Sequence, residues 1–127
     1  MFCPGTPGEG YNKLMKIKEI QDLLQAELLC GEEAKESEIY SACCSDMMSD
    51  VLAFVKEQGV LLTGLVNAQV IRTAAMMDMP CIVFVRSKIP TEEMLILAEE
   101  CGIVVMRSPR RAYEACGILY SHGLNGQ

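Results

Sequence analysis

Apolar residues in this chain fall into short unbroken runs, separated by longer stretches in which they recur every three or four positions. The clearest unbroken runs are residues 60–62, 81–85 and 103–106. An unbroken run predicts a strand covered on both faces, and the wider spacing predicts amphipathic helices. Because helices and strands alternate, we expect right-handed crossovers and a three-layer α/β/α fold with a mainly parallel sheet of about five strands.

The N-terminal part of the chain has the same kinds of element in a less regular order. We expect a helix over 17–25, a strand over 27–30, a solvated acidic loop over 32–38 and a strand over 39–44. Later helices are expected over 47–57, 68–77, 92–101 and 109–121. One domain then spans residues 15–124, between a flexible lead, 1–14, and a tail, 125–127.

Short polar residues precede the predicted helices and predict their starting points. The candidate N-caps are Ser45 or Asp46, Asn67, Thr91 and Ser108, the last followed by Pro109 at a first helical position. Gly59 follows the helix predicted over 47–57, so we expect it to end that helix in a left-handed conformation.

The composition excludes several classes of protein. The chain has 127 residues and a formal net charge of −6, which disfavours general binding to nucleic acid or anionic membranes. It has no apolar run long enough to predict a membrane span. Its seven cysteines are odd in number and include no C-x-x-C pair, so we expect free thiols in a cytoplasmic protein.

The chain lacks the sequence signatures of the common catalytic and metal sites. It has no G-x-S-x-G or H-E-x-x-H motif and only one histidine, so we expect no catalytic residues, metal or cofactor. Cys43 and Cys44 are adjacent in a predicted strand and should face opposite sides of the sheet. They are interpreted as inert core thiols or, alternatively, as a thiol sensor at the strand end.

Polar and basic residues follow each predicted parallel strand. Because the carboxyl ends of parallel strands meet at one edge of a sheet, we expect these residues to form a common rim. The predicted ligand-binding residues are Asp46, Thr63, Gly64, Asn67, Arg86, Ser87, Arg107 and Ser108. Arginine side chains and helix N-termini both favour phosphate or carboxylate groups, so the rim predicts a small anionic ligand or a nucleotide.

A purely structural interpretation of the same residues stays open. Asn67 and Ser108 are good helix caps, and exposed basic side chains are often solvated or paired with nearby acids. Asp46 has three possible roles: it can cap the helix that follows it, bond the turn at Thr63, or bind a ribose hydroxyl.

Several motifs resemble the DRTGG domain. They are residues 44–52, the turn 62–64, the strand 81–85 and the C-terminal helix 113–120, and the resemblance covers about residues 15–124. The family's Asp falls on Asp46, and its Thr-Gly-Gly falls on Thr63, Gly64 and Leu65. The chain departs from the pattern at Met47, where Arg is usual, and at Leu65, which replaces the second Gly.

The resemblance implies an α/β/α fold, a domain without catalysis of its own, and self-association. The chain is similar to the regulatory domain of some phosphate acetyltransferases and of some pyrophosphatases that carry CBS domains, and to the N-terminal domain of HPr kinase/phosphorylase. We therefore expect a non-catalytic regulatory module that senses a small anion or nucleotide and passes that state to a partner protein.

Two other functions stay open. The first is a protein-protein assembly module without a small ligand, acting through a Met-rich surface of a homodimer or partner complex. The nine methionines, among them Met76, Met77 and Met79, favour such a surface because methionine suits adaptable contacts. The second is an enzyme that uses Asp46 with the rim arginines.

Overall fold

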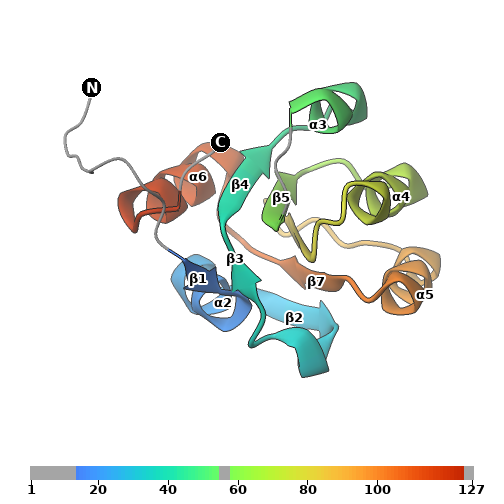
Figure 1. Cartoon of the computed structure of the whole chain (residues 1–127), viewed down its shortest axis with the longest axis horizontal. Coiled ribbons are helices and arrows are strands. Elements are labelled where there is room, and N and C mark those ends of the chain that lie inside the picture. Colours follow the sequence, from blue (N-terminus) through green and yellow to red (C-terminus); the bar gives the residue numbers. More distant parts are fainter. Residues whose placement is uncertain (1–13, 55–57, 125–127) are drawn as a thin grey trace.

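The core of the fold is a five-stranded sheet in the order β2-β7-β6-β5-β4 (Figure 1). The strands are β2 (Glu27–Cys30), β4 (Ser41–Cys44), β5 (Gly59–Thr63), β6 (Cys81–Phe84) and β7 (Val104–Arg107). Strands β4 to β7 run parallel, and β2 lies antiparallel to β7 at one edge. The computed structural model describes residues 14–54 and 58–124. The predicted mainly parallel sheet is confirmed.

Helices cover both faces of this sheet. They are α2 (Ile17–Leu24), α3 (Met48–Phe54), α4 (Ala68–Met76), α5 (Glu92–Cys101) and α6 (Ala112–Ser121). Helices α2 and α6 lie on one face, and α3, α4 and α5 lie on the other (Figure 1). The fold therefore has the three α/β/α layers that the sequence predicts.

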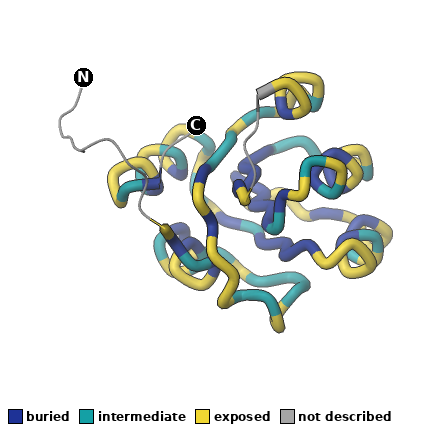
Figure 2. Tube along the Cα trace, viewed as in Figure 1, coloured by how far each residue is buried: buried dark blue, intermediate teal, exposed yellow. Residues whose placement is uncertain are grey.

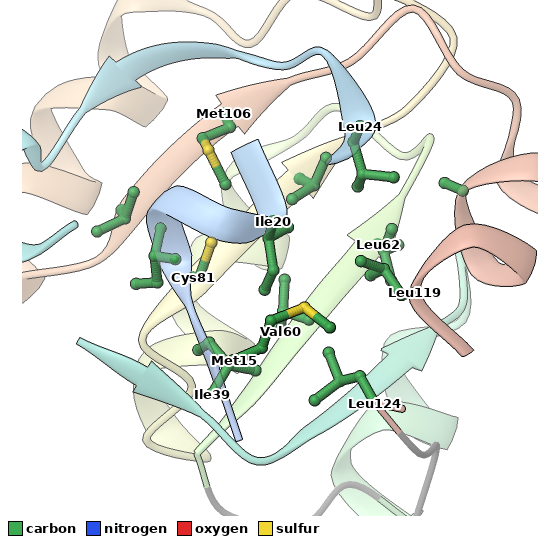
Figure 3. Packing of buried hydrophobic residues seen from close by; sticks show 14 of the residues in the cluster. Met15, Ile20, Leu24, Ile39, Val60, Leu62, Cys81, Met106, Leu119 and Leu124 are labelled. Atoms are coloured by element: carbon green, nitrogen blue, oxygen red, sulfur yellow. The ribbon is translucent and has the colours of Figure 1, made fainter. Parts of the chain in front are cut away.

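Each face of the sheet has its own hydrophobic core, because successive strand residues point to opposite sides. In β5, Val60 and Leu62 pack toward α2 and α6, where they meet Ile20 and Leu119 (Figure 3). Leu61 packs toward α3, α4 and α5. The central strands β5, β6 and β7 are accordingly buried along almost their whole length. The outer strands β2 and β4 are partly exposed, and the helices are exposed on their outer faces (Figure 2). This two-sided burial explains the unbroken apolar runs.

The segment before the parallel strands is more divided than the sequence predicts. The strand predicted over 39–44 is two strands, β3 (Glu38–Ile39) and β4, with a break at Tyr40. Strand β3 is not part of the main sheet and pairs antiparallel with β1 (Met15–Lys16) in a separate two-stranded sheet. The acidic segment predicted as a loop contains a short 3₁₀ helix, η1 (Glu32–Ala34), and its last residue, Glu38, belongs to β3.

The predicted N-caps Asn67 and Thr91 are confirmed, whereas the C-cap predicted at Gly59 is wrong. Asn67 accepts a hydrogen bond from the Gln69 amide and caps α4, and Thr91 likewise accepts from the Met94 amide and caps α5. Gly59 is not a left-handed cap, because it begins β5 opposite Ser41, and the positive φ of 60° falls on Gln58.

Some predictions fall outside the described part of the chain. These are the flexible lead up to residue 13, the end of the helix predicted over 47–57, and the tail 125–127. Within the described ranges, no helix is long and apolar enough to cross a membrane.

Candidate functional site

The loops after β4, β5, β6 and β7 lie along one edge of the sheet, which we call the rim. The register sets this arrangement: Cys44 is opposite Leu62, and Thr63 is opposite Phe84, which in turn is opposite Arg107. All four strands are parallel, so their carboxyl ends point the same way. The predicted convergence of the loops is therefore present in the fold.

Asp46 is fixed at the rim by the next loop along the sheet. Its Oδ1 atom accepts a hydrogen bond of 2.8 Å from the Thr63 hydroxyl and another of 2.8 Å from the Gly64 amide. These two donors, the amide first, hold the pKa of the Asp46 carboxyl below its ordinary value. Of the roles left open by the sequence, Asp46 has the bond to the Thr63 turn, while Ser45 accepts from the Met47 amide before α3.

The guanidinium of Arg86 lies directly against the Gly64 backbone. A Cβ atom on Gly64 would lie 2.9 Å from Arg86 Nη2 and 3.7 Å from Asp46 Oδ2. Any side chain at Gly64 would therefore displace Arg86. The positive charges of Arg86 and Lys88 also help to lower the pKa of Asp46. A carboxylate, a hydroxyl, a backbone turn and a guanidinium thus share one small region.

The turn that carries Arg86 has an unusual backbone. Arg86 and Ser87 have φ angles of 56° and 55°, a left-handed conformation that non-glycine residues rarely adopt. Such residues cost on the order of 1–3 kcal/mol each and persist where other interactions hold them. Here the amides of Arg86 and Ser87 donate to the carbonyls of Arg110 and Ser108, each at 2.8 Å. The neighbouring loop therefore holds the turn that presents Arg86 to solvent.

Arg107 and Ser108 have partners on the other side of the rim. Arg107 pairs with Glu27 of β2 at 2.9 Å and donates to the Ser87 carbonyl at 3.3 Å. The buried Ser108 hydroxyl donates to the Leu24 carbonyl at 2.6 Å and accepts from the Arg110 amide. Ser108 is not a helix cap as predicted, because α6 begins at Ala112 after Arg111.

The rim therefore has two parts of different character. On the Arg107 side, two of the three arginines are paired: Arg107 with Glu27, and Arg110 with Glu114 at 3.2 Å. The third, Arg111, is exposed and forms no salt bridge among the described residues. The Nε atoms of Arg107 and Arg110 are buried without a partner among the described residues. On the Asp46 side, Arg86 and Lys88 are exposed and form no salt bridge within the described part of the chain. Two exposed cations without a salt bridge thus lie close to Asp46.

A second feature, which the sequence did not predict, is a cavity of about 360 Å³ between α6 and β4. Its lining is mostly apolar and includes three cysteine thiols. The lining residues are Ala42, Cys43, Cys44, Leu62, Cys116, Leu119, Tyr120 and Leu124. Cys44 and Cys116 are 72 positions apart, and no local motif links them. Across residues 14–54 and 58–124, no three His, Cys, Asp or Glu side chains converge as a metal-binding group.

Comparison with known proteins supports the fold. No protein-family model and no curated protein sequence matches the chain. A solved structure does: the CBS and DRTGG domains of the regulatory region of Clostridium perfringens pyrophosphatase, complexed with its activator diadenosine tetraphosphate. The TM-score is 0.68 with 21% sequence identity, over 84% of this chain and 46% of that one. This chain thus spans less than half of its structural neighbour, and the likeness supports a DRTGG-like fold.

Proposed function

We propose that this chain is a non-catalytic regulatory module that binds a small anionic ligand, most specifically a nucleotide, at the Asp46 side of the rim. The observation that carries the proposal is the grouping of Asp46, Thr63, Gly64 and Arg86 at the carboxyl edge of the parallel sheet. This edge is where open α/β sheets commonly bind ligands.

The chemistry of these groups suits a phosphorylated ligand. Arg86 and Lys88 supply exposed cations for phosphate, and a guanidinium binds phosphate through two parallel hydrogen bonds. Asp46 Oδ2 makes no hydrogen bond among the described residues, so it is available to accept one from a ribose hydroxyl. The structural neighbour adds support for the nucleotide class, because its regulatory region was crystallised with a dinucleotide activator.

Thermal unfolding of the full chain with a panel of ligands tests this proposal. The panel contains AMP, ADP, ATP, diadenosine tetraphosphate and inorganic phosphate. A ligand at a hundredfold excess over its Kd stabilises the folded state by about 2.7 kcal/mol. We expect Arg86→Gln to remove this stabilisation, because it removes the exposed guanidinium beside Gly64.

The control is Arg72→Gln, which removes the same charge from an exposed position on α4, away from the rim. Each variant is compared with its own ligand-free unfolding temperature, so that a change in basal stability does not count. If the ligand raises the unfolding temperature of both variants equally, Arg86 is not part of the binding site. Turnover of any ligand in the panel would contradict the non-catalytic part of the proposal.

The alternative is an assembly module, and one surface of α6 favours it. Tyr113 and Tyr120 are 93% and 68% exposed, and Gly117 lies between them on the same helical face. Met47 and Met76 are also exposed, but Met47 precedes α3 at the rim whereas Met76 ends α4 at the opposite edge. We therefore propose the α6 face, rather than a Met-rich surface, as the contact in a homodimer or with a partner protein.

Gly117→Gln tests the α6 contact with little risk to the fold. A Cβ on Gly117 would meet no atom within 4 Å, and a helix interior gains roughly 0.5–1 kcal/mol when glycine is replaced by a good helix former. We expect the variant to be at least as stable as the parent chain and to lose self-association in sedimentation velocity. Ile96→Gln, at an exposed apolar position on α5, is the matched control. Unchanged association in both variants would exclude the α6 face.

A further inference from the structure

Two cysteines from distant parts of the sequence meet at the cavity beside α6. Cys44 is the last residue of β4, and Cys116 lies in the middle of α6. Figure 1 shows α6 beside β4 at this edge of the sheet, and both thiols line the cavity. Ala42 and Leu119 belong to the same hydrophobic cluster, so the thiols lie where α6 packs on the sheet.

The two thiols interact directly and have different proton affinities. The Cys44 thiol donates a hydrogen bond to the Cys116 sulfur, which lowers the pKa of Cys116 to about 7. The pKa of Cys44 is raised, first by this hydrogen bond and then by burial and the negative charge of Asp46. Cys116 therefore loses its proton more readily than an ordinary cysteine and forms the thiolate, which is the reactive form.

The other described cysteines lack this arrangement. Cys43 also borders the cavity, but it packs against the hydrophobic cluster on the opposite face of the sheet, and burial, not a hydrogen bond to Cys116, is the main cause of its raised pKa. Cys81 is fully buried, and Cys30 donates to the Ile103 carbonyl at 3.5 Å. Cys101 is exposed at the end of α5, away from the pair on α6 and β4. Among the described cysteines, a mutual hydrogen bond is thus found for Cys44 and Cys116.

We propose that Cys44 and Cys116 are a reversible oxidation site, at which a peroxide converts the two thiols into an intramolecular disulfide. The Cys116 thiolate attacks one peroxide oxygen, the O–O bond breaks, and one water leaves after protonation, which leaves a sulfenic acid on Cys116. The Cys44 sulfur then attacks the Cys116 sulfur, and the S–O bond breaks. The hydroxyl group of the sulfenic acid takes up the proton of Cys44 and leaves as the second water. Two thiols are oxidised by two electrons and one peroxide is reduced to two waters.

The inference is independent of ligand binding at the rim. It depends on the packing of α6 against β4 and on the contact between the two sulfurs. A disulfide here would link β4 to α6 across 72 sequence positions and fix the helix on the sheet. A thiol such as dithiothreitol would reverse it by thiol–disulfide exchange.

Mass spectrometry of the full reduced chain after brief exposure to hydrogen peroxide tests the proposal. Remaining thiols are alkylated and the chain is digested without reductant. We expect a loss of the mass of two hydrogen atoms, a linked peptide containing Cys44 and Cys116, and recovery of both thiols with dithiothreitol. Cys116→Ser should abolish the link, whereas Cys101→Ser should leave it unchanged. A link between two chains, or faster oxidation of Cys101 than of the pair, would overturn the proposal.

The pH dependence of alkylation gives a second measurement that needs no oxidant. Alkylation of Cys116 should rise with an inflection near pH 7, because only the thiolate reacts. In Cys44→Ala the thiolate loses its hydrogen-bond donor, so the pKa of Cys116 should rise toward the ordinary value of 9.0 and the inflection should move to higher pH. An inflection that does not move in Cys44→Ala would mean that the two thiols do not interact in solution, which would also overturn the proposal.

Discussion

Replacing Gly31 by alanine should lower the free energy of unfolding by about 2–4 kcal/mol, the largest single-residue effect that we predict. Gly31 follows β2 with a φ of 90°, a conformation that costs roughly 1 kcal/mol or more for other residues. A Cβ atom there would lie 2.8 Å from Val104 Cα and 2.9 Å from Val104 Cγ2. Because Val104 is fully buried at the start of β7, relief of this clash requires a shift of the backbone, and overpacking adds about 1–3 kcal/mol.

Gly102→Ala is the matched control for this prediction. Gly102 ends α5 with a φ of 73°, but a Cβ atom there would meet nothing within 4 Å. Substitution by alanine should therefore lower the free energy of unfolding by roughly 1 kcal/mol, the penalty for a positive φ alone. Urea denaturation of both variants measures the difference. If both variants lose the same free energy of unfolding, β7 moves aside without cost, and the close approach of Gly31 to Val104 does not add to the destabilisation.

Ser108→Ala should lower the free energy of unfolding by about 1–3 kcal/mol. The Ser108 side chain is fully buried, and its hydroxyl donates to the Leu24 carbonyl at the end of α2 and accepts from the Arg110 amide. Alanine removes both bonds and leaves a carbonyl and an amide without these partners. The control is Ser121→Ala, because Ser121 makes a similar bond to the Gly117 carbonyl at 2.7 Å on an exposed helix face. That variant should change stability by less than about 0.5 kcal/mol.

The Ser108 variant also separates the structural role seen here from the ligand-binding role that the sequence predicts for this residue. If Ser108 only joins the β7 loop to α2, the variant keeps the ligand-induced thermal shift of the parent chain while its basal unfolding temperature falls. If Ser108 binds the ligand, that shift falls as well. A stable variant with a reduced ligand shift would contradict the structural role and restore Ser108 to the binding residues.

The sequence predicts the parallel part of the fold well because burial there is uniform. The runs at 60–62, 81–85 and 103–106 are covered on both faces, so their composition alone indicates central strands. The cap residues Asn67 and Thr91 were predictable for a similar reason, because a cap bonds an amide two or three residues away. Gly59 shows the limit of such local rules, since its pairing with Ser41 decides its conformation.

The candidate site is less predictable because its partners come from distant segments. Asp46 is recognisable as a strand-end carboxylate, but its bond to the Thr63 turn requires the register between β4 and β5. Arg107 has the type and position of a ligand-binding residue, yet it is paired with Glu27, 80 positions earlier. Nothing in the sequence places β2 beside β7, so the neutralisation of Arg107 could not be foreseen.

The antiparallel pairing of β2 with β7 also constrains how the chain folds during synthesis. Glu27 is made 80 residues before its partner Arg107, and among the described strands β7 is the one neighbour of β2 in the main sheet. The edge of β2 therefore stays open while most of the domain is being translated, and closing so long a loop is slow. Completion of the sheet must wait until β7 has been made.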